Sequence, residues 1–368
     1  MAFPTDFIIF ASEILHFDMK KGPIVTFGEL LLRFSKDDHL RLTQGRRLNG
    51  DYGGSEANVA VSLATLGDHV EYVTRLPSST VGRAAALTLS QYGVGTGNVL
   101  YGDGRMGCYY FEASAGMRNS LVSYDRANSA YYALKPGMID WHRILRDASV
   151  LHVSGITAAI SQDAADATME ALDVADELGL TVSFDINYRK NLWQYGANPR
   201  ETLSRMLSRC DLMFGDVIEF EFISQRKAPL FDARDNSYEM NAELYRDWFE
   251  DMQRQFPRCK RWLMGMRNQI SSSHHVLTAL LWADQTLYKT RVYDIDCVVD
   301  PMGVGDAFMA AMLHAEMADL GSNQQKLDYA LAAATLKNSV PGDFNLTTDA
   351  EIRWLLDSGY QPALKVTI

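Results

Sequence analysis

Between residues 137 and 266 the chain alternates between short apolar runs, typical of buried strands, and longer segments with helical spacing. Repeated strand–helix units predict an α/β domain whose mainly parallel sheet is covered by helices on both faces. Ligands in such sheets bind at the carboxyl ends of the strands. The expected strands are 150–154, 181–186, 211–214 and 261–266, with helices near 139–147, at 163–178, after Asn198 and at 241–255. An antiparallel hairpin is expected at 276–293, and helices at 305–320, 323–339 and 348–357.

A glycine-rich turn stands where a predicted strand, 291–299, gives way to a predicted buried helix that begins near 305. The turn consists of Gly303, Val304, Gly305 and Asp306. The free amides and positive dipole end of a helix start suit a phosphate, and glycines let it approach the backbone. Asp306 would then lie beside that phosphate, where it can accept a proton from an attacking hydroxyl. The alternative is a turn followed by an ordinary helix cap.

A second glycine turn opens a helix near the amino terminus. Residues 53–67 predict a Gly-Gly turn, a buried helix of small and apolar residues, and a glycine C-cap. Asn58 would point out of the first turn of this helix, either as a local cap or as a ligand of a sugar hydroxyl. The preceding strand is expected at 24–34. It lacks the Gly-x-Gly-x-x-Gly of dinucleotide-binding folds, which disfavours a nicotinamide dehydrogenase.

Two segments depart from the α/β pattern. Residues 35–52 are polar and basic, and residues 105–130 predict a hairpin with a glycine-containing loop. If both return to one place, they form a small β-sheet lid beside the main domain. A small sheet exposes its edges and an apolar face, so we expect a homodimer through the lid.

Composition narrows the partners and the compartment. The net charge of −11 argues against binding to nucleic acid or anionic membranes. No run of ~20 apolar residues is present to span a membrane. The four cysteines are scattered without a CxxC pair, which argues against a disulfide framework or metal cluster and fits the cytoplasm. Residues 1–21 are expected to be an extension without a signal-peptide pattern, and 22–368 one domain with the lid segments inserted.

Together these features resemble the ribokinase-like sugar kinases, the phosphofructokinase-B family, over roughly residues 22–358. The motifs that carry the resemblance are 53–60 and 303–308. Within the family, the chain is most similar to 2-keto-3-deoxygluconate kinases. That closer likeness rests on residues 28–33, 124–130, the polar run 185–189 with Leu192-Trp193, and the ending Gly342-Asp343-Phe344-Asn345.

The resemblance implies a three-layer ribokinase-like fold with a β lid. It also implies ATP and Mg²⁺, with a monovalent cation as a further candidate, and phosphoryl transfer to the terminal hydroxyl of a keto-deoxy sugar acid. Asp306 takes the general-base position, and Gly303, Val304 and Gly305 supply the anion hole. The expected substrate contacts are Gly54, Asn58, Tyr109, Tyr124, Arg126 and Arg189, and the expected nucleotide contacts are Arg267 and Asn338.

The chain departs from the family pattern at three places. Pro301 and Met302 stand where a Thr-x pair is usual, so a hydroxyl near the phosphates is lost. The strand ending at Arg267 lacks a common threonine. The family's Asn-x-x-Glu, which helps organise Mg²⁺, has its nearest match in Asp216 and Glu219, which alternatively form a solvated helix start.

Two alternatives to a kinase for 2-keto-3-deoxygluconate therefore stay open. One is the same chemistry on another sugar acid or on a neutral ketose such as fructose. The other is a sugar-binding or regulatory relative without catalysis, suggested by Pro301, Met302 and Gly215. Retention of Asp306 and both glycines of the turn argues against the second.

Overall fold

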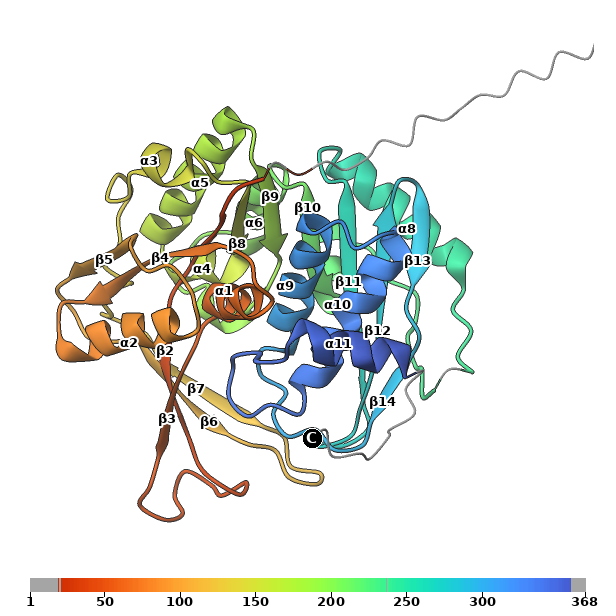
Figure 1. Ribbon diagram of the computed structural model, residues 1–368, viewed down its shortest axis with the longest axis horizontal. Coiled ribbons are helices and arrows are strands. Elements are labelled where there is room, and N and C mark those ends of the chain that lie inside the picture. The colour runs from red at the N-terminus through yellow and green to blue at the C-terminus, as the bar shows by residue number, and fades with distance from the viewer. Residues whose placement is uncertain (1–18, 20, 236, 359–368) are drawn as a thin grey trace, which may run out of the picture.

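The computed structural model describes residue 19, residues 21–235 and residues 237–358, so all of the expected extension at 1–21 except residues 19 and 21 lies outside the described residues. A large central sheet has helices on both faces, and a smaller sheet projects from one side of it (Figure 1). The ten-stranded sheet has the order β13-β12-β11-β10-β9-β8-β1-β4-β5, with β14 also paired to β12. All pairs from β11 to β5 are parallel, whereas β12 pairs antiparallel with β11, β13 and β14. The predicted α/β fold with its lid is confirmed.

The strands of the central sheet are β1 (Ile24–Phe27), β4 (Val70–Pro77), β5 (Val99–Gly102), β8 (Val150–Ser154), β9 (Thr181–Asp185), β10 (Leu212–Asp216), β11 (Arg261–Gln269), β12 (His275–Ala283), β13 (Thr286–Lys289) and β14 (Tyr293–Ile295). The helices are α1 (Ser55–Thr65), α2 (Thr80–Gln91), α3 (Trp141–Leu145), α4 (Gly155–Ile160), α5 (Gln162–Leu178), α6 (Pro199–Leu207), α7 (Val217–Ser224), α8 (Ala242–Gln255), α9 (Val304–Met317), α10 (Asn323–Lys337) and α11 (Asp349–Asp357), with a 3₁₀ turn at Lys190–Leu192.

Two hydrophobic cores lie on opposite faces of the central sheet. Successive side chains of a strand point to opposite faces, so Ile24 joins one core and Val25 the other. Helices α1, α2, α9, α10 and α11 close the first core, and α3 to α8 close the second. Helices α1 and α9 are buried nearly all round, as expected from their small and apolar residues. The two helices that carry the glycine motifs therefore lie side by side on one face of the sheet.

The lid is a four-stranded sheet built from both segments that depart from the α/β pattern and from residues 31–34, the end of the expected first strand. Its order is β3-β2-β6-β7, with β2 parallel to β6 and the two outer strands antiparallel to their neighbours. The strands are β2 (Leu31–Ser35), β3 (Asn49–Gly53), β6 (Cys108–Glu112) and β7 (Leu121–Asp125). In Figure 1 they extend from the main domain below α1 and α2.

Two strand predictions are wrong. The expected strand 24–34 divides at 28–30, because Glu29 turns inward to a buried ion pair with Arg126 and the chain crosses into the lid. The expected strand 291–299 keeps pairing only at Tyr293–Ile295. Beyond Ile295 the chain turns from β12 toward the C-terminal end of α10, where the carbonyl of Asn338 accepts hydrogen bonds from the amides of Val299 and Asp300. In the described part of the chain, no helix is both long and apolar enough to cross a membrane.

Candidate active site

The site is centred on the first turn of α9. Gly303 is the N-cap residue and has a φ of 78°, a left-handed conformation that favours glycine. A Cβ at this position would collide with the carbonyl oxygen of Asp343. Among the described residues no side chain caps the helix, so the amides of Val304, Gly305 and Asp306 are left to meet an anion. Free amides at a helix start can bind a phosphate, and the predicted phosphate-binding role of this turn stays a prediction.

Asp306 is held by two side chains from the start of α1. Its Oδ1 accepts a hydrogen bond from the Ser55 hydroxyl at 2.8 Å, and its Oδ2 accepts one from the Asn58 amide at 2.7 Å. Burial raises the pKa of Asp306 above its ordinary value, while the bonds from Asn58 and Ser55 act in the opposite direction. The carboxylate is thus fixed in orientation and made more basic than an exposed aspartate, which suits a proton acceptor.

A polar chain from the end of β9 continues this arrangement. The Asn187 amide donates to the Ser55 hydroxyl at 2.9 Å and to Asp185 at 2.7 Å. Because Ser55 accepts there, its own proton is free to point at Asp306. Arg189 donates to the side-chain oxygen of Asn187. The polar run after β9 is therefore connected to the α9 turn through Ser55.

The first turn of α1 has a different role from the expected one. The side chain of Asn58 is buried and binds Asp306, while its Oδ1 accepts from the Gly54 amide at 3.2 Å. A Cβ at Gly54 would collide with the carbonyl oxygen of Glu29, so this close approach requires glycine. In this structure the two residues orient the aspartate rather than present free groups to a sugar hydroxyl.

The other predicted substrate contacts divide into buried and accessible side chains. The Tyr109 hydroxyl donates to Asp343 at 2.6 Å, and Arg126 forms a 2.6 Å ion pair with Glu29; both side chains are buried. These two groups are therefore paired with carboxylates of the chain itself, and their predicted contact with the substrate stays a prediction. Tyr124 is 44% exposed and Arg189 keeps 45% of its side chain exposed, so these two remain available to a ligand.

The predicted nucleotide and metal residues lie at the ends of β10 and β11. Arg267 is exposed, two residues beyond the position that pairs with Asp216. Asp216 and Glu219 form a capping box at the start of α7, and Glu219 also binds Arg189 at 3.0 Å. Burial raises the pKa of Glu219 to about 7. Glu219 is thus committed to structural contacts, whereas Asp216 is exposed and has one oxygen outside the capping bond.

Asn338, the second predicted nucleotide contact, lies at the C-terminal end of α10. Its side chain is buried and donates to the carbonyls of Ala334 and Thr335 in the preceding helix α10. What it contributes to the site is its backbone carbonyl, which holds the segment leading to Gly303. The predicted nucleotide contact of this side chain stays a prediction.

Several site residues were not assigned a role from the sequence. Asp185 and Asn187 belong to the polar run noted after β9, but nothing in the pattern indicated contact with Ser55. Arg33 lies in the 28–33 motif, and it binds Asp300 at 2.6 Å and Asp343 at 2.7 Å. The contacts of Ser55 and Arg33 join residues that are far apart in the chain. The only signal for them in the sequence was the presence of charged or polar residues at the ends of predicted strands.

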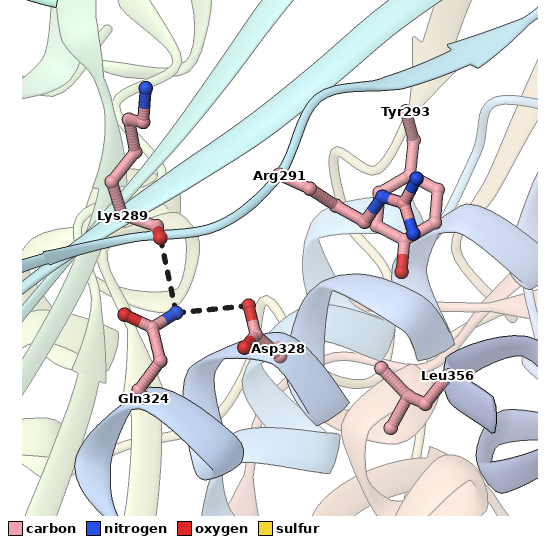
Figure 2. A pocket seen from close by; sticks show the side chains of 6 residues that line it. All are labelled: Lys289, Arg291, Tyr293, Gln324, Asp328 and Leu356. Atoms are coloured by element: carbon pink, nitrogen blue, oxygen red, sulfur yellow. Dashed lines mark hydrogen bonds between the residues drawn. The ribbon is translucent and has the colours of Figure 1, made fainter. Parts of the chain in front are cut away.

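A separate cavity of about 340 Å³ lies outside this site (Figure 2). It is lined by Lys289, Arg291, Tyr293, Gln324, Asp328 and Leu356. The Gln324 amide joins two parts of its wall by donating to the Lys289 carbonyl and to Asp328, each at 3.0 Å. None of the predicted site residues lines this cavity. Across the described residues, no three or more metal-ligating His, Cys, Asp or Glu side chains lie together.

Comparisons with known proteins agree with this geometry. Residues 22–243 match the model of the pfkB family carbohydrate kinases. The chain is 30% identical to 2-dehydro-3-deoxygalactonokinase of Haloferax volcanii, over 91% of this chain and 97% of that protein. It is 25% identical to fructokinase-1 of Oryza sativa subsp. japonica, over 91% of this chain and 98% of the relative.

Among solved structures, 2-dehydro-3-deoxygluconokinase of Thermotoga maritima is 33% identical and superposes with a TM-score of 0.84. That match covers 92% of this chain and 100% of the other. The family match covers more than half of the chain, and full-length relatives share both its sequence and its fold. The chain belongs to the pfkB family and is a carbohydrate kinase.

Proposed function

We propose that this kinase transfers the γ-phosphoryl group of ATP to the terminal hydroxyl of 2-keto-3-deoxygluconate, forming the 6-phosphate. The observation that carries the proposal is the position of Asp306. It lies in the first turn of α9, beside the uncapped amides of Val304 and Gly305, and both its oxygens are held by α1. A proton acceptor and an anion hole are thus adjacent on one rigid element.

The chemistry depends on that adjacency. The sugar hydroxyl gives its proton to Asp306 as its oxygen bonds to the γ-phosphorus, and the bond to the β-phosphate oxygen breaks to release ADP. The amides of 304–306 and the positive end of α9 stabilise the charge on the transferring group. Gly303 and Gly305 leave this backbone accessible.

A sugar acid is favoured over a neutral sugar by the charge of the site. Arg189 is partly exposed and lies two residues beyond Asn187, which joins it to Ser55 and the catalytic turn. A guanidinium binds a carboxylate through two parallel hydrogen bonds, and Tyr124 is an accessible donor on the lid. The names of the archaeal and Thermotoga relatives also refer to keto-deoxy sugar acids.

The proposed cofactor is Mg²⁺ bound with the nucleotide. Mg²⁺ usually takes one or two carboxylates together with phosphate oxygens and waters. Asp216, exposed at the end of β10, fits such a ligand, whereas Glu219 is occupied by Arg189. The ion would supply positive charge between the phosphates. Arg267, exposed on the neighbouring strand, is the proposed nucleotide contact, and a monovalent cation remains a prediction without a described set of ligands.

A substrate panel separates the alternatives. ADP release would be measured with 2-keto-3-deoxygluconate, 2-keto-3-deoxygalactonate and fructose, the last because a fructokinase is among the relatives. We expect the highest kcat/KM with a keto-deoxy sugar acid. Preference for fructose would overturn the substrate assignment. Turnover of none of the sugars would favour a relative that only binds its ligand.

The role of Asp306 is tested by Asp306→Asn. A positioned general base contributes ~10²–10⁴-fold to a rate, so kcat should fall by that factor. Binding of ATP, measured by calorimetry, should change little because Asp306 faces the acceptor hydroxyl. The matched control is Asp357→Asn on the exposed surface of α11. A variant that turns over at nearly the normal rate would remove Asp306 from the mechanism.

The dependence of activity on pH should respond to Asn58. The hydrogen bond from Asn58 lowers the pKa of Asp306, so Asn58→Leu should raise it. A general base works only when deprotonated, and the acid limb of kcat should therefore move to higher pH. Ser55→Ala removes the other donor and should act in the same direction. Asn323→Leu, on the first turn of α10, serves as control. If the acid limb of kcat stays at the same pH in both Asn58→Leu and Ser55→Ala, Asp306 is not the general base.

The carboxylate contact is tested at Arg189 rather than Arg126. Loss of Arg126 would leave Glu29 buried without a counter-charge, which costs ~3–5 kcal/mol of stability and would obscure the effect on activity. Loss of Arg189 removes the partner of Glu219 as well, but Glu219 still accepts a hydrogen bond from the Asp216 amide. Arg189→Gln removes a charge-assisted bond of ~1.5–3 kcal/mol, so kcat/KM for the sugar acid should fall roughly 10–200-fold. The decrease in kcat/KM for a neutral ketose should be much smaller, because it has no carboxylate to lose. Arg254→Gln on α8 is the matched control, and equal losses on both sugars would show a purely structural role.

We further propose a cytoplasmic homodimer formed through the lid. All five residues of the edge strand β7 are exposed, and Leu121 is 56% exposed on the face opposite Tyr124. An exposed apolar edge strand favours pairing with a second copy. Leu121→Lys should shift the mass measured by light scattering from dimer toward monomer. A wild-type chain that is monomeric at high concentration would exclude this assembly.

A further inference from the structure

A buried lysine lies directly behind the anion hole. Lys337 is the last residue of α10, and its side chain is fully buried. Its ammonium donates to the carbonyl oxygen of Val340 at 2.9 Å and lies 3.5 Å from the carbonyl oxygen of Asp300. Lysines are rarely buried without partners, because removing the ammonium from water costs several kcal/mol. The fold keeps this charge inside where two loops meet.

The two loops are the segment that leads into α9 and the segment between α10 and α11. The amides of Val299 and Asp300 donate to the Asn338 carbonyl at 2.8 and 3.3 Å. From the loop after α10, the Gly342 amide donates back to Asp300 Oδ2 at 3.0 Å. The Lys337 ammonium adds a third tie through the Asp300 carbonyl. The start of the anion-hole turn is thus held in place by the loop after α10.

The lysine also reaches the cap residue itself. A Cβ on Gly303 would lie 3.4 Å from the Cε of Lys337, so the lysine stem packs against the N-cap of α9. A shift of this side chain would move the residue whose left-handed conformation begins the helix. The next amides, at Val304 and Gly305, would then point elsewhere.

Four charged side chains lie near enough to act on the Lys337 ammonium. Asp300 and Asp343 are its carboxylate neighbours, Arg33 is held by both of them from lid strand β2, and Asp306 faces it from α9. Burial lowers the pKa of Lys337 to about 8, while Asp300 and Asp343 act to raise it. The Tyr109 hydroxyl donates a hydrogen bond to Asp343 and so belongs to this group of interacting side chains.

We propose that Lys337 is a positioning residue for phosphoryl transfer: its ammonium joins the Asp300 and Val340 carbonyls and thereby aims the first-turn amides of α9 at the transferring group. This inference rests on the proposed function. It assigns to a residue that touches no substrate the alignment of the anion hole. Misplacement of such donors by about 1 Å costs on the order of 100-fold in rate.

The experiment compares Lys337→Met with Lys337→Arg. The methionine variant keeps the length of the side chain without its charge, and kcat should fall on the order of 100-fold with little change in the KM of the sugar. The arginine variant keeps a charge and should recover part of the rate. Lys326→Met is the matched control, since Lys326 is also buried in α10 but pairs with Glu316 and Asp319. It should lower the melting temperature without lowering kcat at a temperature where the variant is folded.

The pH profile distinguishes positioning from a merely structural role. The ammonium is charged below its pKa of about 8 and neutral above it. The kcat of the wild type should therefore fall as pH rises through that value, and Lys337→Arg should lose this basic limb because a guanidinium stays charged. An unchanged basic limb in Lys337→Arg, or a folded Lys337→Met with wild-type kcat, overturns the proposal. If neither variant folds, the wild type decides: a kcat that stays flat from about pH 7 to pH 10 overturns it.

A binding measurement separates this proposal from the substrate assignment. The anion hole meets the γ-phosphate, so Lys337→Met should reduce the preference for ATP over ADP measured by calorimetry without any sugar. If the wild type turns over no sugar acid, the substrate proposal fails, while the ATP–ADP difference still tests Lys337. An unaltered preference in the folded variant contradicts the positioning role.

Discussion

A buried arginine connects the three parts of the molecule that meet at the site. Arg33 lies on lid strand β2, and its terminal nitrogens bind Asp300, before α9, and Asp343, after α10. All three side chains are buried. Removal of the guanidinium would leave two carboxylates in the interior without their counter-charge, which would lower the free energy of unfolding by ~3–5 kcal/mol. Lys337 lies near both carboxylates, and its positive charge offsets the negative charge that Arg33 alone leaves. The lid, the anion-hole turn and the C-terminal loop therefore hold one another in place.

The site handles anions although the chain carries a net charge of −11. At the turn, Arg33 and Lys337 offset the buried carboxylates Asp300 and Asp343, so the free amides and positive end of α9 are left to attract an anion. Burial raises the pKa of Glu56 to about 7 and that of Asp185 well above its ordinary value. Part of the buried carboxylate charge is thus neutralised near pH 7, which reduces the repulsion of an anionic ligand. Local geometry, not overall charge, decides what binds.

The fold and the central motif were predictable because both depend on local patterns. Alternating strands and helices imply a parallel sheet, and a Gly-x-Gly-Asp turn at a helix start implies free amides beside a carboxylate. Partner choice was not predictable. Asn58 donates to Asp306 and Arg126 pairs with Glu29, because the packing of α1, α9 and the lid brings these residues together.

The sequence by itself determined the element order, the two glycine turns and the identity of the base candidate, since backbone preference and hydrophobic period act over a few residues. Only the tertiary structure decided where the first strand ends, which arginine remains accessible, and that Asn338 acts through its carbonyl. It also revealed Lys337 behind the anion hole. These features depend on desolvation and on contacts such as Arg33 with Asp343, which are 310 residues apart in the chain. No local pattern encodes such a contact, because its energy exists only once the interior has closed around it.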